Sequence, residues 1–152
     1  MKLNFYKYQG AGNDFIMVDN RDLSFPKKNT HLINKLCDRR FGIGADGLIL
    51  LESSKNEDFT MVYFNADGNE GSMCGNGGRC IVAFAKHLGV IKHETNFNAV
   101  DGLHYATIEN EIVKLKMIDV SEIKVSDSQA FLNTGSPHHI EFCKNIAEIN
   151  VK

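Results

Sequence analysis

The sequence NADGNEGSMCGNGGRC, from Asn65 to Cys80, contains five glycines within an eleven-residue stretch. An apolar run of strand length, Phe59 to Phe64, precedes it, and the dense apolar pattern of a helix follows it. We therefore expect a strand, a glycine-rich turn and a helix in that order, with Cys74 at the point where the helix begins. Because glycine lets the backbone approach another group closely, this turn is the first candidate for a functional site.

The segment from Gly75 to Leu88 is predicted to form the main helix, which Gly89 ends. Its apolar side chains lie nearly all round the helix, and its polar ones, Arg79, Lys86 and His87, share one narrow stripe. Glycines in the first turn weaken an isolated helix by up to ~1 kcal/mol each relative to alanine. Such a helix forms only when packing stabilises it, so we expect it to be buried and wrapped by a sheet.

Short apolar and β-branched runs predict strands on both sides of this helix. The predicted strands cover residues 3–9, 14–19, 47–52, 59–65, 95–100, 103–109 and 112–117. The third and fourth should pair as a hairpin, as should the last two. A second, amphipathic helix should begin after Asn29-Thr30 and end near Gly42. These elements predict an α+β fold in residues 1–118: a mixed, mostly antiparallel sheet curled around a central buried helix.

A change in composition marks a predicted domain boundary further along the chain. The segment from Asp119 to Ser128 is polar and charged. Ala130 to Asn133 and His139 to Phe142 then have the pattern of strands. We expect residues 119–152 to be a linker and the beginning of a second, truncated domain.

The composition argues against several classes of protein. The chain has 152 residues and a formal net charge of −2, with no basic cluster that would suit nucleic acid. No apolar run approaches the ~18 residues that a membrane helix needs, and the N-terminal stretch lacks the apolar core of a signal peptide. Four scattered cysteines are too few for a disulfide framework. We expect a cytoplasmic protein that binds neither nucleic acid nor a membrane, and the sequence leaves a homodimer open.

Cys74 has a setting that suits proton transfer. The unpaired N–H groups of Gly75, Asn76 and Gly77 and the positive end of the helix dipole favour a thiolate, which can accept a proton. The same N–H groups form a cradle for a small carboxylate or phosphate. A free cysteine is more often a small buried residue, but the glycine-rich context favours a functional thiol here.

The other cysteines and one glycine motif carry weaker signals. No closely spaced partner ligands accompany Cys80, so we interpret it as a core residue and not as a metal ligand. Cys37 and Cys143, which lie in apolar patterns, receive the same interpretation. The stretch GIGADG, from Gly42 to Gly47, matches the dinucleotide fingerprint, but it neither follows a strand nor opens a helix. We therefore discard it.

Polar residues in two kinds of turn could be functional or structural. Asn13 and Asn65 lie in glycine turns, where their amides could bind a ligand, although asparagine in a turn often bonds its own backbone. His138 and His139 follow the tight turn that starts at Thr134. Loops on a rigid scaffold often carry function, so we weigh the two roles of these histidines equally.

Four stretches, taken together, resemble the diaminopimelate epimerase family. They are GAGNDF from Gly10, NADG from Asn65, MCGNGGRC from Met73 and TGSPHH from Thr134, and they occur in that order over almost the whole chain. The resemblance implies an isomerase that interconverts LL- and meso-diaminopimelate in lysine and peptidoglycan biosynthesis, without pyridoxal phosphate or a metal. It also implies that the chain covers about the first half of a family enzyme, whose second domain is pseudo-symmetric with the first.

The resemblance implies a role for several residues. In the family, two cysteines face opposite sides of the substrate's α-carbon, and one removes the proton as a thiolate while the other delivers one as a thiol. Cys74 matches the first of these cysteines. Gly75 and Asn76 match positions whose backbone holds the reacting carboxylate, and His138 matches a histidine that tunes the cysteine pair.

Further positions match the family or depart from it. Asn13 and Asn65 match side chains that bind substrate. Gly47 stands where several relatives have a substrate-contacting glutamine, and Ser136 stands where many have asparagine, although its hydroxyl is still a donor. Contacts to the far end of the substrate are therefore expected to differ. Nothing in the chain matches the second catalytic cysteine, because Cys143 lacks the glycine-rich setting of that residue.

We therefore predict the N-terminal part of a cofactor-independent amino-acid epimerase, inactive on its own in two-base epimerisation. One alternative is a proline racemase-like isomerase of the same fold. A second alternative is a non-catalytic small-molecule-binding domain that keeps the anion-binding helix start. A third, a redox-sensing thiol protein, would require Cys74 to form a reversible disulfide with a partner.

Overall fold

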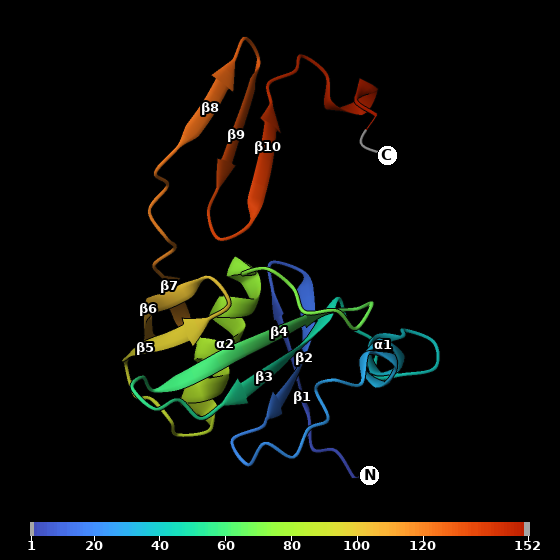
Figure 1. Cartoon of the computed structure of the whole chain (residues 1–152), viewed down its shortest axis with the longest axis vertical. Helices are drawn as coiled ribbons and strands as arrows, with labels where there is room; N and C mark the ends of the chain where they lie inside the picture. The colour runs from blue at the N-terminus through green and yellow to red at the C-terminus, as the bar shows by residue number, and fades with distance from the viewer. Residues whose placement is uncertain (1, 151–152) are drawn as a thin grey trace. The chain divides into compact units, whose positions relative to one another are not determined.

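The computed structural model describes residues 2–150 of the chain. These residues form two compact units, of which the first ends at Met117 and the second starts at Ile118. Figure 1 colours the chain from its N-terminus to its C-terminus. The first unit contains the glycine-rich turn and Cys74, whereas the second contains His138.

Seven strands form the sheet of the first unit, and each pairs with its neighbours in the sequence. They are β1 (Tyr6–Gly10), β2 (Asn13–Asp19), β3 (Gly47–Glu52), β4 (Phe59–Asn65), β5 (Glu94–Ala99), β6 (Gly102–Glu109) and β7 (Ile112–Leu115). The β2–β3 and β4–β5 pairs are parallel, and the other pairs are antiparallel. The sheet is therefore mixed and mostly antiparallel, and the predicted β3–β4 and β6–β7 hairpins are both present.

Helix α2 (Gly75–His87) fills the curl of this sheet (Figure 1). It contacts both edge strands, β1 and β7, as well as strands between them, which requires the sheet to bend around it. Ile81, Val82 and Phe84 are completely buried. Packing thus stabilises a helix whose first turn has low helix propensity, and the predicted fold of a curled sheet around a buried helix is confirmed.

Strand β3 is buried on both of its faces. Ile49 and Leu51 pack in the cluster that contains α2, whereas Leu48 and Leu50 pack in the cluster that contains helix α1 (Thr30–Cys37). Alternate residues of a strand point to opposite faces, so a strand covered on both sides needs a continuous apolar run. The two helices therefore pack against opposite faces of the sheet.

Helix α1 begins after its predicted polar cap but ends earlier than we expected. The helix ends at Cys37 and not near Gly42, because the carboxylate of Asp38 accepts hydrogen bonds from the N–H groups of Arg40 and Phe41. This side chain offers the backbone a turn in place of another helical turn. Gly42 instead packs against the last turn of α1, where a side chain would overlap the backbone.

The turn after β4 is attached to the start of α1. Gly68 has a φ angle of +91°, and a side chain there would overlap the carbonyl of Thr30. Nearby, Nδ2 of Asn34 donates a hydrogen bond of 2.9 Å to the carbonyl of Ala66. These contacts fix the end of β4 and, with it, the position of Asn65.

The second unit is a three-stranded antiparallel sheet followed by a 3-10 helix. Its elements are β8 (Ile123–Ser126), β9 (Gln129–Asn133), β10 (Pro137–Glu141) and the 3-10 helix η1 (Ile146–Glu148). The last two strands lie close to the predicted ones. Strand β8, however, lies inside the segment that we expected to be a polar linker. Ile123 and Val125 alternate with polar residues there, and this period of two supports a strand.

Cys143 does not have the core position that we expected. It is exposed, because it follows β10 in an irregular segment whose neighbouring side chains are also exposed. An apolar pattern in a short terminal segment therefore gave a wrong prediction of burial.

The Gly68 contact can be tested by two alanine variants. Gly68→Ala should destabilise the first unit by more than the ~1–3 kcal/mol of backbone strain alone, since it adds an overlap with Thr30. Gly89→Ala is the matched control, because Gly89 has a φ angle of +70° with no atom within 4 Å of the added Cβ. Urea unfolding followed by circular dichroism measures both losses. Equal losses would show that the Gly68 contact does not constrain the fold.

Candidate functional site

Cys74 lies at the N-terminus of α2, as predicted, and is the N-cap residue of that helix. Its Sγ accepts a hydrogen bond from the N–H of Gly77 at 3.4 Å. Cys74 is partly exposed, whereas Cys37 and Cys80 are buried, and burial raises the pKa of both buried thiols to about 11. Of these three thiols, Cys74 is therefore the one that a ligand can reach.

Asn13 lies beside Cys74, as the predicted site requires. The thiol donates to Oδ1 of Asn13 at 3.6 Å, and Nδ2 of the same amide donates to Oδ2 of Asp46 at 2.8 Å. Asp46 thereby orients the amide. Because Oδ1 can only accept, it bonds the thiol, whereas the N–H of Gly77 can donate to the sulfur in either protonation state. The site thus has a partner for the thiol and for the thiolate.

Asp46 belongs to a network of charged side chains. Arg39 bridges Asp14 and Asp46 at distances of 2.7 and 2.8 Å, and Lys7 pairs with Asp14 at 2.8 Å. The hydrogen bond from Arg39, assisted by Lys7, holds the pKa of Asp14 well below its usual range. The hydrogen bond from Asn13 likewise lowers the pKa of Asp46. Asp46 is therefore ionised at neutral pH and available to orient Asn13.

The first turn of α2 presents donors for an anion. Within residues 2–150, the N–H groups of Gly75 and Asn76 have no hydrogen-bond acceptor, as is usual for the first residues of a helix. Arg79, one turn further on, donates to Oδ1 of Asn76. Its Nη1 would lie 3.8 Å from a Cβ placed on Gly75. Two N–H groups and a guanidinium group thus form a positive site that suits a carboxylate.

Asn65 ends β4 with an exposed side chain, and its amide makes no hydrogen bond within the described part of the chain. Its partner across the β3–β4 pair is Gly47. A Cβ on Gly47 would lie 2.5 Å from Cε2 of Tyr63, so the ring of Tyr63 occupies the space that a side chain at position 47 would need. Position 47 lacks the side chain that several relatives have there, and the ring of Tyr63, from the neighbouring strand β4, fills that space.

Several glycines of the quoted stretch approach the core of the protein itself. A Cβ would lie 2.9 Å from Cδ1 of Ile49 if placed on Gly77, and 2.6 Å from Cδ2 of Leu115 if placed on Gly78. These glycines let α2 lie close to the sheet. Gly75 is different, because a Cβ placed there would make only ordinary van der Waals contacts, at 3.8 Å from Nη1 of Arg79 and from Sδ of Met117. The protein's own packing therefore does not require a glycine at this position.

His138 and Ser136 lie in the second unit. The carbonyl of Ser136 accepts a hydrogen bond of 2.8 Å from Nδ1 of His138. A carbonyl oxygen can only accept, so Nδ1 carries a hydrogen. Nε2 is the ring nitrogen that makes no hydrogen bond to any described residue. The roles of both residues toward Cys74 stay predictions.

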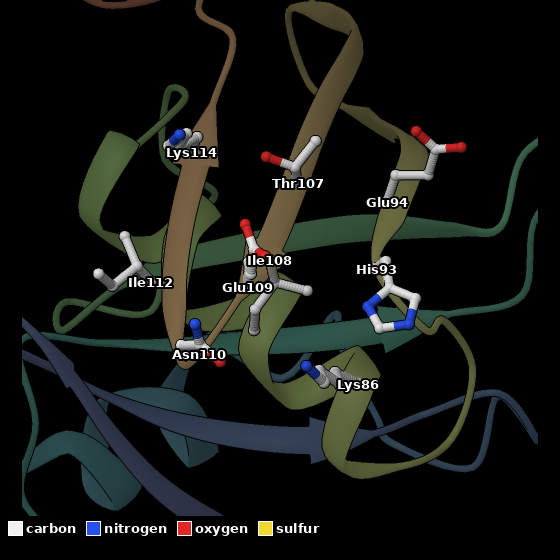
Figure 2. A pocket seen from close by; sticks show the side chains of 9 residues that line it. All are labelled: Lys86, His93, Glu94, Thr107, Ile108, Glu109, Asn110, Ile112 and Lys114. Atoms are coloured by element: carbon white, nitrogen blue, oxygen red, sulfur yellow. The ribbon is translucent and has the colours of Figure 1, made fainter.

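A separate pocket of about 610 Å³ lies at the C-terminal end of α2 (Figure 2). It is lined by side chains of both charges, among them Lys86 of α2, Glu94 of β5 and Lys114 of β7. Helix α2 has 13 residues and is therefore about 20 Å long. The pocket is thus distinct from the site at Cys74.

Two further findings concern metal ions and membranes. In the described residues, no group of three or more His, Cys, Asp or Glu side chains could hold a metal ion. No helix formed by residues 2–150 is long and apolar enough to cross a membrane.

Three residues near Cys74 were not predicted from the sequence: Tyr63, Asp46 and Arg79. Tyr63 could have been found, because it lies two residues before Asn65 and therefore on the same face of β4. Arg79 lies about one helical turn after Gly75. Asp46 gave no local signal, since its bond to the amide of Asn13 joins residues 33 positions apart.

Comparison with known proteins identifies relatives of this chain. A family model described as diaminopimelate epimerase matches residues 5–123. A diaminopimelate epimerase of Flavobacterium psychrophilum is 63% identical over 151 residues, which are 99% of this chain and 59% of that protein. A diaminopimelate epimerase of Chlorobaculum tepidum is 45% identical and is matched over 93% of this chain and 58% of its own length. The chain thus spans a little under three fifths of the length of these relatives.

Solved structures share the fold at lower identity. A Bacillus anthracis phenazine biosynthesis protein of the PhzF family has a TM-score of 0.64 at 19% identity, over 93% of this chain and 56% of that one. A probable proline racemase from Agrobacterium radiobacter has a TM-score of 0.59 at 14% identity, over 86% and 49%. These likenesses show the fold alone, and they support the predicted α+β class.

The charged network predicts a specific dependence of stability on pH. A carboxylate whose pKa is lower in the folded than in the unfolded chain stabilises the fold above its unfolded pKa of about 4. This contribution is lost as the pH falls toward the folded pKa. Asp14→Asn should therefore lower the melting temperature at pH 7 and flatten its dependence on pH between about pH 5 and pH 2.

Thermal unfolding followed by circular dichroism at several pH values checks this expectation. Arg39→Gln should also flatten the dependence of the melting temperature on pH over this range, because Arg39 is the main cause of the low pKa of Asp14. Asp119→Asn is the matched control, since Asp119 is an exposed carboxylate of the second unit. If the melting temperature of Asp14→Asn changed with pH as steeply as that of the parent protein, the charged network would not stabilise the fold.

Proposed function

The chain belongs to the diaminopimelate epimerase family, and from this we propose that the whole protein interconverts LL- and meso-diaminopimelate. This isomerase reaction belongs to lysine biosynthesis and would take place in the cytoplasm. One observation carries the proposal: a reachable thiol, Cys74, caps a helix whose first N–H groups are free to hold a carboxylate.

The first requirement of the reaction is to acidify the α-proton of an amino acid. Negative charge develops on the neighbouring carboxylate as this proton leaves, and preformed donors stabilise that charge. The N–H groups of Gly75 and Asn76 are such donors, and the guanidinium group of Arg79 adds a positive charge beside them. The start of α2 would therefore bind the carboxylate of the reacting centre.

The second requirement is a base that can also return a proton. As a thiolate, Cys74 would remove the α-proton, and its sulfur would keep the hydrogen bond from Gly77. As a thiol, it would donate to Oδ1 of Asn13, which Asp46 holds in place. Since the protein offers a partner to each state of the sulfur, neither state is left unbonded during proton exchange.

Inversion at the α-carbon also requires a proton carrier on the opposite face. Cys37 and Cys80 cannot supply it, because both are buried in the core. The relatives of this chain are longer, since it spans 59% and 58% of them. We propose that the second carrier comes from the part of the relatives that this chain does not match, and that residues 1–152 alone do not epimerise.

The second unit would then be the beginning of a second domain, pseudo-symmetric with the first. In this proposal His138 would adjust the cysteine pair through Nε2, because its Nδ1 is bonded to the carbonyl of Ser136. The hydroxyl of Ser136 and the free amide of Asn65 would contribute substrate contacts. No cofactor is required by these steps, since every proton movement uses a thiol.

The role of Cys74 can be tested by substitution in the whole protein. Cys74→Ala should reduce kcat for formation of the meso isomer from LL-diaminopimelate by at least the ~10²–10⁴-fold that a general base contributes. Nuclear magnetic resonance in deuterium oxide measures both isomer formation and exchange of the α-hydrogen. Circular dichroism should show an unchanged fold.

Cys143→Ala is the matched control, because Cys143 is the exposed cysteine of the second unit. Its turnover should equal that of the parent protein. Turnover by Cys74→Ala at the parent rate would overturn the proposed function. Binding of diaminopimelate by the 152-residue chain with the affinity of the whole protein would instead favour a non-catalytic binding domain.

A further inference from the structure

The ring of Tyr63 lies across the end of strand β3 because two glycines leave room for it. A Cβ on Gly47 would lie 2.5 Å from Cε2 and 3.2 Å from Cζ of this ring, and a Cβ on Gly71 would lie 2.5 Å from Cε1. Phe15 packs edge-on against the ring, with a distance of 6.0 Å between the centroids. Neighbours on three sides therefore fix the orientation of the ring.

Strand register shows where the hydroxyl end of the ring lies. Tyr63 is the register partner of Ile49, but its Cζ, which carries the hydroxyl, lies over Gly47 in the next row of the sheet. The residues beside Gly47 in that row are Phe15 on β2 and Asn65 on β4. The ring thus leans from its own row toward the strand end that carries Asn65.

The same strand end carries the thiol site. Asn13, which accepts the hydrogen bond from Cys74, lies two residues before Phe15 and on the same face of β2. Cys74 approaches this face through Gly77, since a Cβ on Gly77 would lie 3.5 Å from Cβ of Cys74 and 2.9 Å from Cδ1 of Ile49. The hydroxyl end of Tyr63 therefore belongs to the rim that contains Asn13, Asn65 and Cys74.

The hydroxyl of Tyr63 is a hydrogen-bond donor without an acceptor among the described residues. Burial of the ring, followed by the nearby Cys74, raises the pKa of Tyr63 to about 12. The phenol thus keeps its proton at neutral pH. At this pH the amino groups of an amino acid are protonated and cannot accept, so a carboxylate oxygen is the acceptor that such a donor would find on this ligand.

We propose that the Tyr63 hydroxyl donates a hydrogen bond to the second carboxylate of the bound amino acid, the one that the start of α2 does not hold. This inference rests on the proposed function, because it takes the ligand at Cys74 to be a dicarboxylic amino acid. Tyr63 then contributes to the selection of substrate at a distance from the reacting carbon. Gly47 and Gly71 contribute to this selection indirectly, because they leave room for the ring.

Tyr63→Phe in the whole protein separates this role from that of a space-filling ring, since it removes the hydroxyl and keeps the ring. KM for diaminopimelate should rise by about 10- to 100-fold, the effect of one hydrogen bond to a charged group. Because the lost contact lies away from the reacting carbon, kcat should change by less than about threefold. The melting temperature should stay that of the parent protein.

Tyr105→Phe is the matched control, because the Tyr105 hydroxyl donates to Glu94 at 2.8 Å on the exposed side of β6. It should leave KM and kcat unchanged. Calorimetry with diaminopimelate gives a second readout that does not need turnover, and Tyr63→Phe should weaken binding by the same factor as it raises KM.

The outcomes distinguish this inference from the proposed function. An active parent protein with an unchanged KM in Tyr63→Phe would overturn the role of Tyr63 and leave the function intact. A parent protein that binds diaminopimelate without epimerising it would overturn the function. The dissociation constants of Tyr63→Phe and of the parent protein, compared by calorimetry, would still decide the role of Tyr63. A parent protein that does not bind diaminopimelate would overturn both.

Discussion

The hydrogen bond from the N–H of Gly77 to Sγ of Cys74 fixes where helix α2 begins. The rest of the first unit determines where this N-terminus of α2 lies. The curled sheet buries the rest of α2, so that its first turn is left at the strand ends where Asn13 and Asn65 lie. A cap made by cysteine in place of serine or aspartate brings a thiol to the position where free N–H groups and the helix dipole meet. The local requirement of a helix end and the chemical requirement of the site are met by one side chain.

Close packing explains why the site needs so many glycines. Gly77 and Gly78 let α2 approach the sheet, and Gly71 and Gly47 admit the ring of Tyr63. These glycines therefore serve the protein's own contacts, whereas a Cβ on Gly75 would make only ordinary van der Waals contacts. The glycine-rich turn indicated a close approach correctly, but the group that is approached is mainly the core.

Much of the first unit could be predicted from sequence because its signals are local. The run GLILLE predicted a strand, and the burial of β3 on both faces explains why this run does not alternate. The end of α1 was predicted wrongly, since the competing turn at Asp38 depends on side-chain bonds to the backbone that a helical pattern does not show. Strand β8 was missed and Cys143 was misplaced for a related reason: short segments of the second unit carry too few residues for periodicity to decide between strand, loop and core.

The candidate site likewise contains residues that could be predicted from the sequence and residues that could not. Cys74, Gly75 and Asn76 follow from a motif whose residues are adjacent in sequence, so their common position could be predicted. The contacts that Asp46, Arg79 and Tyr63 make needed the structure, because each depends on strand register or on the direction of a side chain. The charged network around Asp14 shows this most clearly, since it joins residues of β1, β2 and the segment after α1.

If substrate binds against the thiol of Cys74, it must hinder the alkylation of that thiol by iodoacetamide. In the whole protein, mass spectrometry can follow Cys74 and Cys143 in one reaction, with and without diaminopimelate. We expect diaminopimelate to slow the alkylation of Cys74 and to leave that of Cys143 unchanged. An equal rate for Cys74 with and without saturating diaminopimelate would show that substrate does not bind against this thiol.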